Sequence, residues 1–198
     1  FDMVFAEPDR TSPLKMAEAL PETFTERSEI VEVLRRLPDN DDVFAQAIAK
    51  APVVLSFFGA RGEALNKPRK IAGVSWLGND LSGNLNQYDG GITSLQTFQD
   101  NATGHGFITL SDRDDDIIRS VQIFAAQENQ VFPLLSVELL RVAIQNAVGD
   151  LQSFVLKTTF SGTEGGSVDS ASGNRASITS ARVANFEFPL TESAELIV

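Results

Sequence analysis

The sequence predicts an α/β fold, a single domain in which helices pack on a mixed β-sheet. Three segments carry this prediction: residues 1–5, 53–58 and 133–148. The first alternates in the two-residue period of a strand with one apolar face. The second is an apolar run typical of a strand covered on both sides, and the third repeats apolar residues at helical spacing. A chain of 198 residues is long enough to bury a sizeable core.

The strand predicted over residues 1–5 leads into a polar turn and a short helix. Pro8 lies in the turn, where it removes a backbone donor and stops ladder pairing. The helix is expected over residues 13–20, because Ser12 is placed to cap it and Pro13 suits its first position. A core strand at the first residue, without an initiator Met, indicates that the chain was cut from a longer protein.

Two more helices are expected before the strand at 53–58. Apolar residues recur at helical spacing over residues 30–37, and Pro38 ends that pattern. The next helix spans residues 40–51. The run Asn40-Asp41-Asp42 opens it with a cap and with charges that favour a helix N-terminus.

The middle of the chain alternates short elements with polar segments. A strand is expected over residues 74–77, and residues 78–91 are predicted to be an exposed loop because they are rich in Gly, Asn and Asp. A short helix follows over 92–98. Two strands, at 106–110 and 120–124, flank an acidic turn.

The C-terminal part begins with the long helix over residues 133–148, which opens on a proline. A strand is expected at 153–156. Residues 161–177 contain scarcely an apolar side chain and are predicted to form a mobile loop. Strands over 178–188 and 195–198 complete the chain.

Composition excludes several classes of function. The net charge of −11 repels phosphate backbones and anionic lipid head groups, so no nucleic-acid partner is expected. The chain has no Cys, which excludes disulfides, thiolate catalysis and thiolate metal sites. No apolar run reaches the length of a membrane helix, so contact with a membrane is expected only through segments outside this chain.

Neither a metal site nor a cofactor is predicted. The acidic turn starts with the spacing of a calcium loop, but Ile117 and Ile123 occupy the positions that require Gly and Glu. A solvated turn is the favoured interpretation. His105 is the only His, and a structural or surface role is favoured over catalysis. Trp76 and Tyr88 could stack on a small ligand, but core burial is favoured for Trp76.

Five charged residues form the candidate ligand site. Glu7, Asp9 and Arg10 follow the first strand, and Asp115 and Arg119 lie in the acidic turn. Open α/β sheets bind ligands beyond the carboxyl ends of their strands, so these side chains could together hold a small polar or cationic molecule. The alternative, which is favoured, is that they only join two loops through hydrogen bonds and ion pairs.

Three motifs in order resemble those of a known family. They are F-D-M-V-F-A-E-P-D-R at 1–10, G-H-G-F-I-T at 104–109 running into D-D-D-I-I-R at 114–119, and V-F-P-L-L-S-V-E-L-L at 131–140. Together they resemble the type-2 CHASE domain, a sensor family of bacterial transmembrane receptors. Asp116 stands where the family pattern has Gly. The family's first strand and helix are absent, so residues 1–198 correspond to a domain without its N-terminal part.

The resemblance implies a sensory input module on the extracytoplasmic, periplasmic side of the cell membrane. In that family the module controls an adenylate or guanylate cyclase, a histidine kinase or a Ser/Thr kinase through transmembrane helices. It implies an unidentified small-molecule or environmental signal and a homodimer in the parent receptor. This chain itself is expected not to be an enzyme. The alternatives are a soluble hydrolase-type fragment that uses Glu7, Asp9 and the acidic turn, and a domain whose role is dimerisation.

Overall fold

The computed structural model describes residues 1–62, 66–69, 72–108, 120–128, 130–149, 153–160, 176–191 and 195–197. In chain order, its elements are α1 (Pro13–Glu18), α2 (Arg27–Leu34), α3 (Asn40–Ile48), β1 (Val54–Ala60), β2 (Gly73–Leu77), η1 (Ser82–Asn84), β3 (Asn86–Tyr88), β4 (Gly90–Ile92), α4 (Gln96–Asn101), β5 (Gly104–Phe107), β6 (Ser120–Gln122), β7 (Phe124–Gln127), β8 (Gln130–Pro133), α5 (Leu135–Val148), β9 (Ser153–Phe160), β10 (Ala176–Val183), β11 (Phe186–Pro189) and β12 (Glu195–Ile197).

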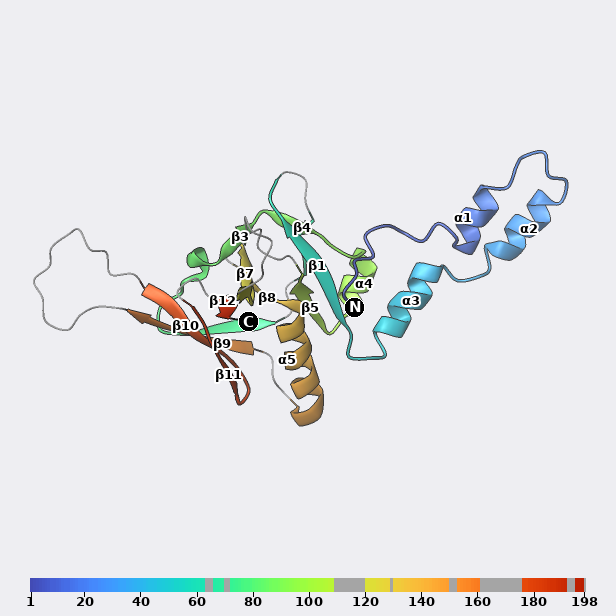
Figure 1. Cartoon of the computed structure of the whole chain (residues 1–198). Helices are drawn as coiled ribbons and strands as arrows, with labels where there is room; N and C mark the ends of the chain where they lie inside the picture. The colour runs from blue at the N-terminus through green and yellow to red at the C-terminus, as the bar shows by residue number, and fades with distance from the viewer. Residues whose placement is uncertain are drawn as a thin grey trace, which may run out of the picture.

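The predicted α/β class with mixed strand pairing is confirmed. β1 pairs parallel with β5 and antiparallel with β4. The other described strands form the sheet β11-β10-β9-β2, the sheet β3-β7-β8 and the pair β12-β6. In Figure 1, α5 lies beside β1 and β5 on one side of this sheet, while α3 and α4 lie on its other side, where Leu55 packs against them. The strands and α5 form the body of the molecule.

α5 packs closely on β5 because two glycines of the strand face it. A Cβ on Gly106 would lie 2.5 Å from the Leu135 Cα atom, and a Cβ on Gly104 would lie 2.4 Å from the Glu138 Oε1 atom. The carboxylate of Glu138 is buried there and accepts hydrogen bonds from the buried Arg141 guanidinium at 2.6 and 2.7 Å. The missing Cβ atoms therefore let the α5 backbone at Leu135 and the buried Glu138–Arg141 ion pair of α5 lie close to β5.

The prediction of a core strand over residues 1–5 is wrong. The segment forms no ladder. It lies along β1 through hydrogen bonds from the Phe1 amino group to the Val54 carbonyl at 2.7 Å and from the Ser56 hydroxyl to the Met3 carbonyl at 3.0 Å. Phe5 packs instead against the rings of α3 and α4. The alternating pattern thus marks a segment held by its aromatic side chains.

The prediction of an exposed loop over residues 78–91 is also wrong. The segment contains η1, β3 and β4, and β4 approaches β1 closely. A Cβ on Gly91 would lie 2.6 Å from the Phe58 carbonyl oxygen. Gly and Asn in this segment allow close backbone contact, which composition alone does not distinguish from loop formation.

Three boundaries in the C-terminal half differ from the prediction. Pro133 ends β8 opposite Phe124, and α5 begins two residues later. Residues 178–188 form the β10–β11 hairpin, which turns at Ala184 with a φ of 49°. The first two residues of β10 belong to the predicted loop 161–177, whose remaining residues lie outside the described structure.

The three helices predicted for the first fifty residues are present, but α1 and α3 end two to three residues before their predicted ends, α2 lies three residues earlier than predicted, and the capping differs at one point. Ser12 precedes α1 and Pro13 opens it, as expected. The Ser12 hydroxyl, however, serves α3: it accepts a hydrogen bond from the Asn40 backbone N–H at 3.2 Å and donates to Asp39 at 3.0 Å. The Asp39 carboxylate caps α3 by accepting from the Asp41 N–H at 2.8 Å. Figure 1 shows α1 and α2 projecting from the body beyond α3.

Candidate functional site

A pocket of about 310 Å³ lies where the N-terminal segment meets α3 and α4. Its walls come from three phenylalanines and its rim from polar and acidic side chains. The lining residues are Phe5, Glu7, Asp9, Asn40, Asp41, Phe44 and Phe98. Two of the predicted site residues, Glu7 and Asp9, therefore lie at one cavity.

The apolar wall is a cluster of edge-to-face rings. The ring centroids of Phe44 lie 5.1 Å from those of both Phe5 and Phe98, and Phe5 lies 5.9 Å from Phe98. Phe98 is buried, and the other two rings are partly exposed. Phe5 is fixed by its backbone, which accepts from the Leu95 N–H at 2.8 Å and donates to the Ser94 hydroxyl at 3.1 Å. The wall is thus set by main-chain contacts as well as by packing.

Asp9 is the most heavily bonded residue of the rim. Its carboxylate accepts from the Thr11 N–H at 3.0 Å, the Thr11 hydroxyl at 2.9 Å and the Asn40 side-chain amide at 2.7 Å. These bonds, the Thr11 backbone bond first, lower the pKa of Asp9 to about 2. The Asp9 N–H in turn donates to the Asp41 carboxylate at 3.0 Å. The favoured interpretation of Asp9 as a residue that joins loops fits this network.

Glu7 and Asp9 are poorly suited to act as paired catalytic acids. A general acid at neutral pH needs a raised pKa, whereas the pKa of Asp9 is lowered. Glu7 forms an exposed ion pair with Arg10 three residues later. This geometry gives the rim negative charge, and the lowered pKa of Asp9 keeps that carboxyl ionised at neutral pH.

The structure tests only part of the predicted cluster. Glu7, Asp9 and Arg10 are placed as described, whereas Asp115 and Arg119 lie outside the described residues. Asp41 and Phe44 were missed as site residues because the sequence assigns them to the cap and the apolar face of a helix. Phe residues on the faces of two neighbouring helices, close to an acidic cap, are the signal that could have found them.

The other residues considered in the sequence analysis, His105, Trp76 and Tyr88, pack against other parts of the fold. His105 lies within β5 and is 3% exposed, and its pKa is lowered to about 4, chiefly by burial. Trp76 packs partly buried against the main core, and the Tyr88 ring lies over Gly59. In the described part of the chain, no three His, Asp or Glu side chains are grouped so that they could bind a metal ion.

Comparison with known protein families assigns the chain to one of them. The family model described as the CHASE2 domain matches residues 1–195. The chain belongs to the CHASE2 domain family. CHASE2 domains are sensory domains of signalling receptors rather than catalytic domains. No curated protein and no solved structure matches the chain.

Two of the motifs expected for a CHASE2 domain lie at defined places in this fold, one at the pocket and one where α5 packs on β5. The first motif supplies the pocket residues Phe5, Glu7 and Asp9, and the glycines at 104 and 106 permit the close packing of α5. Among the residues that the structure describes, no helix has both the length and the apolar character needed to cross a membrane.

Proposed function

We propose that this CHASE2 domain is the extracytoplasmic input domain of a bacterial transmembrane receptor. The observation that carries the proposal is the family match over residues 1–195. The output domain lies outside this chain and is an adenylate or guanylate cyclase or a kinase. The acidic net charge of −11 suits a domain that stays clear of the anionic membrane surface.

The signal is a small cationic molecule that binds the pocket between the N-terminal segment, α3 and α4. A volume of about 310 Å³ holds roughly ten non-hydrogen atoms, at about 30 Å³ for each water-sized unit. The faces of the Phe5 and Phe44 rings attract a cation, and the carboxylates of Glu7 and Asp41 add favourable charge at the rim. A positively charged nitrogen that carries a short apolar group fits both the aromatic wall and the acidic rim of the pocket.

Binding would act on the arrangement of the elements that form the pocket. Asp9 and Asn40, which lie more than thirty positions apart, meet at the rim. A ligand that contacts both sides of this junction favours one relative position of the N-terminal segment and α3. Such differential affinity shifts the population of receptor conformations, which is how the signal reaches the output domain.

Labelling in intact cells tests the location. The chain has no Cys, and Val148 at the end of α5 is exposed. In the parent receptor, a Val148→Cys variant should react with a membrane-impermeant maleimide in intact cells. A matched Val142→Cys variant, buried on the same helix, should react only after denaturation. Labelling of Val148→Cys only after cell lysis would contradict the proposed location.

A thermal-shift and calorimetric series tests the pocket. Short-chain amines and quaternary ammonium compounds should stabilise the domain, whereas alcohols and carboxylates of the same shape should not. Asp41→Asn should weaken cation binding about fivefold, the loss of about 1 kcal/mol for a partly exposed ion pair. Asp42→Asn is the matched control, because the neighbouring Asp42 does not line the pocket. Equal binding by both variants would refute the assignment of Asp41.

A further inference from the structure

A second cavity, of about 420 Å³, lies between α5 and the segments that lead into β1 and β5. In Figure 1, the connection from α3 to β1 passes beside α5. Within this connection, the Val53 N–H donates to the Ala51 carbonyl at 2.8 Å. The Val53 carbonyl in turn accepts from the Thr103 N–H, also at 2.8 Å. Two walls of the cavity are therefore joined by backbone hydrogen bonds and are formed before any ligand binds.

The side-chain amide of Gln145 has a fixed orientation at this cavity. Arg141, which is 2% exposed, donates to the Gln145 Oε1 atom at 2.7 Å and to the Glu138 carboxylate. A guanidinium only donates hydrogen bonds, so the oxygen of the amide must be the atom that faces Arg141. The Gln145 Nε2 group has no partner among the residues that the structure describes. Because Gln145 lines the cavity, this amide offers it a hydrogen-bond donor.

Three more lining residues offer polar groups: the Lys50 ammonium, the Thr103 hydroxyl and the Asn146 side-chain amide. None of these groups has a hydrogen-bond or ion-pair partner in the described part of the chain. Lys50 is the one charged residue among the described residues of the lining. The charge of the neighbouring Arg141 is balanced by Glu138. The cavity thus presents one uncompensated positive charge with hydrogen-bonding groups beside it.

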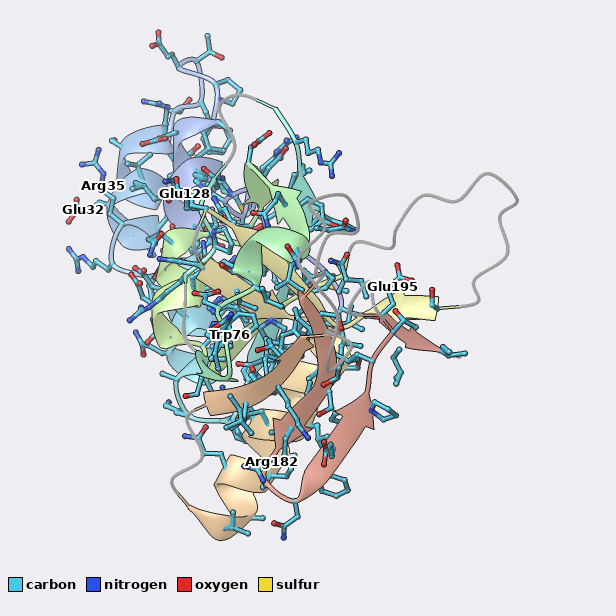
Figure 2. The ribbon with its side chains drawn as sticks, turned by 90° about the vertical axis from the view of Figure 1, so that its left-hand side faces the viewer. Glu32, Arg35, Trp76, Glu128, Arg182 and Glu195 are labelled. Carbon is cyan, nitrogen blue, oxygen red and sulfur yellow. The ribbon has the colours of Figure 1, made fainter. Side chains whose placement is uncertain are left out.

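The cavity is open to solvent. Lys50 and Asn146 are both exposed. In Figure 2, the C-terminal turns of α5 form the lower end of the molecule, and the labelled acidic side chains of Glu32, Glu128 and Glu195 lie well above it. An anion therefore reaches Lys50 without passing these carboxylates.

We propose that this cavity binds a small polyhydroxylated carboxylate of the acyclic sugar-acid class. The Lys50 ammonium pairs with the carboxylate, and its single charge matches a monoanion. The Thr103 hydroxyl and the amides of Gln145 and Asn146 bind the hydroxyl groups. The rest of the lining consists of small apolar residues, which pack against the C–H groups of the ligand: Ala49, Ala51, Pro52 and Val142.

The size and the lining of the cavity agree with this class. A volume of about 420 Å³ holds roughly fourteen non-hydrogen atoms at about 30 Å³ for each water-sized unit, and a six-carbon sugar acid has about thirteen. The described lining contains no aromatic ring on which a sugar ring could stack, which favours an open-chain ligand. No residue is shared with the pocket between the N-terminal segment, α3 and α4, so the proposal does not depend on the cation site.

Isothermal titration calorimetry of the 198-residue chain with three probes tests the ligand class. Gluconate carries both the charge and the hydroxyl groups, sorbitol lacks the carboxylate, and hexanoate lacks the hydroxyl groups. Gluconate should bind with a Kd between about 10 µM and 1 mM. Sorbitol and hexanoate should each bind at least about tenfold more weakly, because each satisfies only part of the lining.

Two variants test the named side chains. Lys50→Gln should raise the gluconate Kd about three- to fivefold and leave sorbitol binding unchanged, a charge-specific difference that a merely structural role would not produce. Lys157→Gln is the matched control, since Lys157 is also exposed but lies on β9 outside the cavity. Gln145→Glu keeps an oxygen for Arg141 and replaces the Nε2 donor with a carboxylate oxygen. This variant should raise the gluconate Kd at least about tenfold without lowering the thermal unfolding temperature.

The outcomes separate this site from the cation pocket. Asp41→Asn should bind gluconate as the wild type does, and a loss of gluconate binding in that variant would overturn the proposal. Absence of gluconate binding up to about 10 mM overturns it as well. So does equal binding of gluconate and either of the other probes, or a gluconate Kd that is the same in Lys50→Gln and Lys157→Gln.

Discussion

The buried His105 should make the domain less stable in mild acid. His105 is 3% exposed, and neither ring nitrogen has a hydrogen-bond partner among the described residues. Burial, with a smaller contribution from the nearby Arg69 guanidinium, lowers its pKa to about 4, while Asp100 opposes the shift. The neutral imidazole is therefore the form that the folded domain tolerates.

The magnitude follows from the two pKa values. The unfolded chain has a His pKa of about 6.5, so unfolding binds a proton between pH 6.5 and pH 4. The contribution of neutral His105 to the free energy of unfolding is fully present above pH 6.5 and is lost as the pH falls through 4. Between pH 7 and pH 5 this linkage removes about 2 kcal/mol, and full protonation removes about 3 kcal/mol.

Two measurements check this value. Because the chain has one His, its imidazole NMR signals report the folded pKa without assignment, and the midpoint should lie near 4. Urea unfolding at pH 7 and pH 5 should show the loss of about 2 kcal/mol relative to a His105→Leu variant. The variant should be within about 1 kcal/mol of wild type at pH 7, because it removes donors and acceptors that lack partners. An NMR midpoint near 6.5 would refute the reasoning.

Two further substitutions test the packing and the capping. Gly106→Ala should lower the free energy of unfolding by about 1 to 3 kcal/mol in urea denaturation, because its Cβ meets the α5 backbone at Leu135, whereas Gly83→Ala at an open position should cost less than about 1 kcal/mol. Asp39→Ala should cost about 1 kcal/mol through loss of the α3 cap, and Asp39→Asn should retain most of that stability; equal losses in both variants would mean that the side-chain charge, and not the cap bond, matters.

Helices with capping signals were predictable from the sequence because their signals are local. An acidic cap and Pro52 bound α3, and a broad apolar face identifies α5. The buried strand β1 was also predictable from its apolar run. Short polar strands were not, since β3 and β4 depend on partners distant in the chain. The same limit explains residues 1–5, where ring contacts with α3 and α4 replace a ladder.

The candidate site was predictable in part. Glu7 and Asp9 do line a pocket, but the residues opposite them come from helices whose apolar and capping positions have an ordinary structural explanation. Sequence order cannot show that Phe44 and Phe98 face Phe5, because that contact depends on how α3 and α4 dock. The role of Asp115 and Arg119 stays a prediction.

The output activity of the parent receptor, measured while a pocket-binding cation is added on the outer face of the membrane, tests the central claim most directly. The account predicts that the cation changes this activity and that an Asp41→Asn receptor needs about fivefold more of it than an Asp42→Asn receptor. An output activity that stays constant while the domain binds the cation would contradict the account.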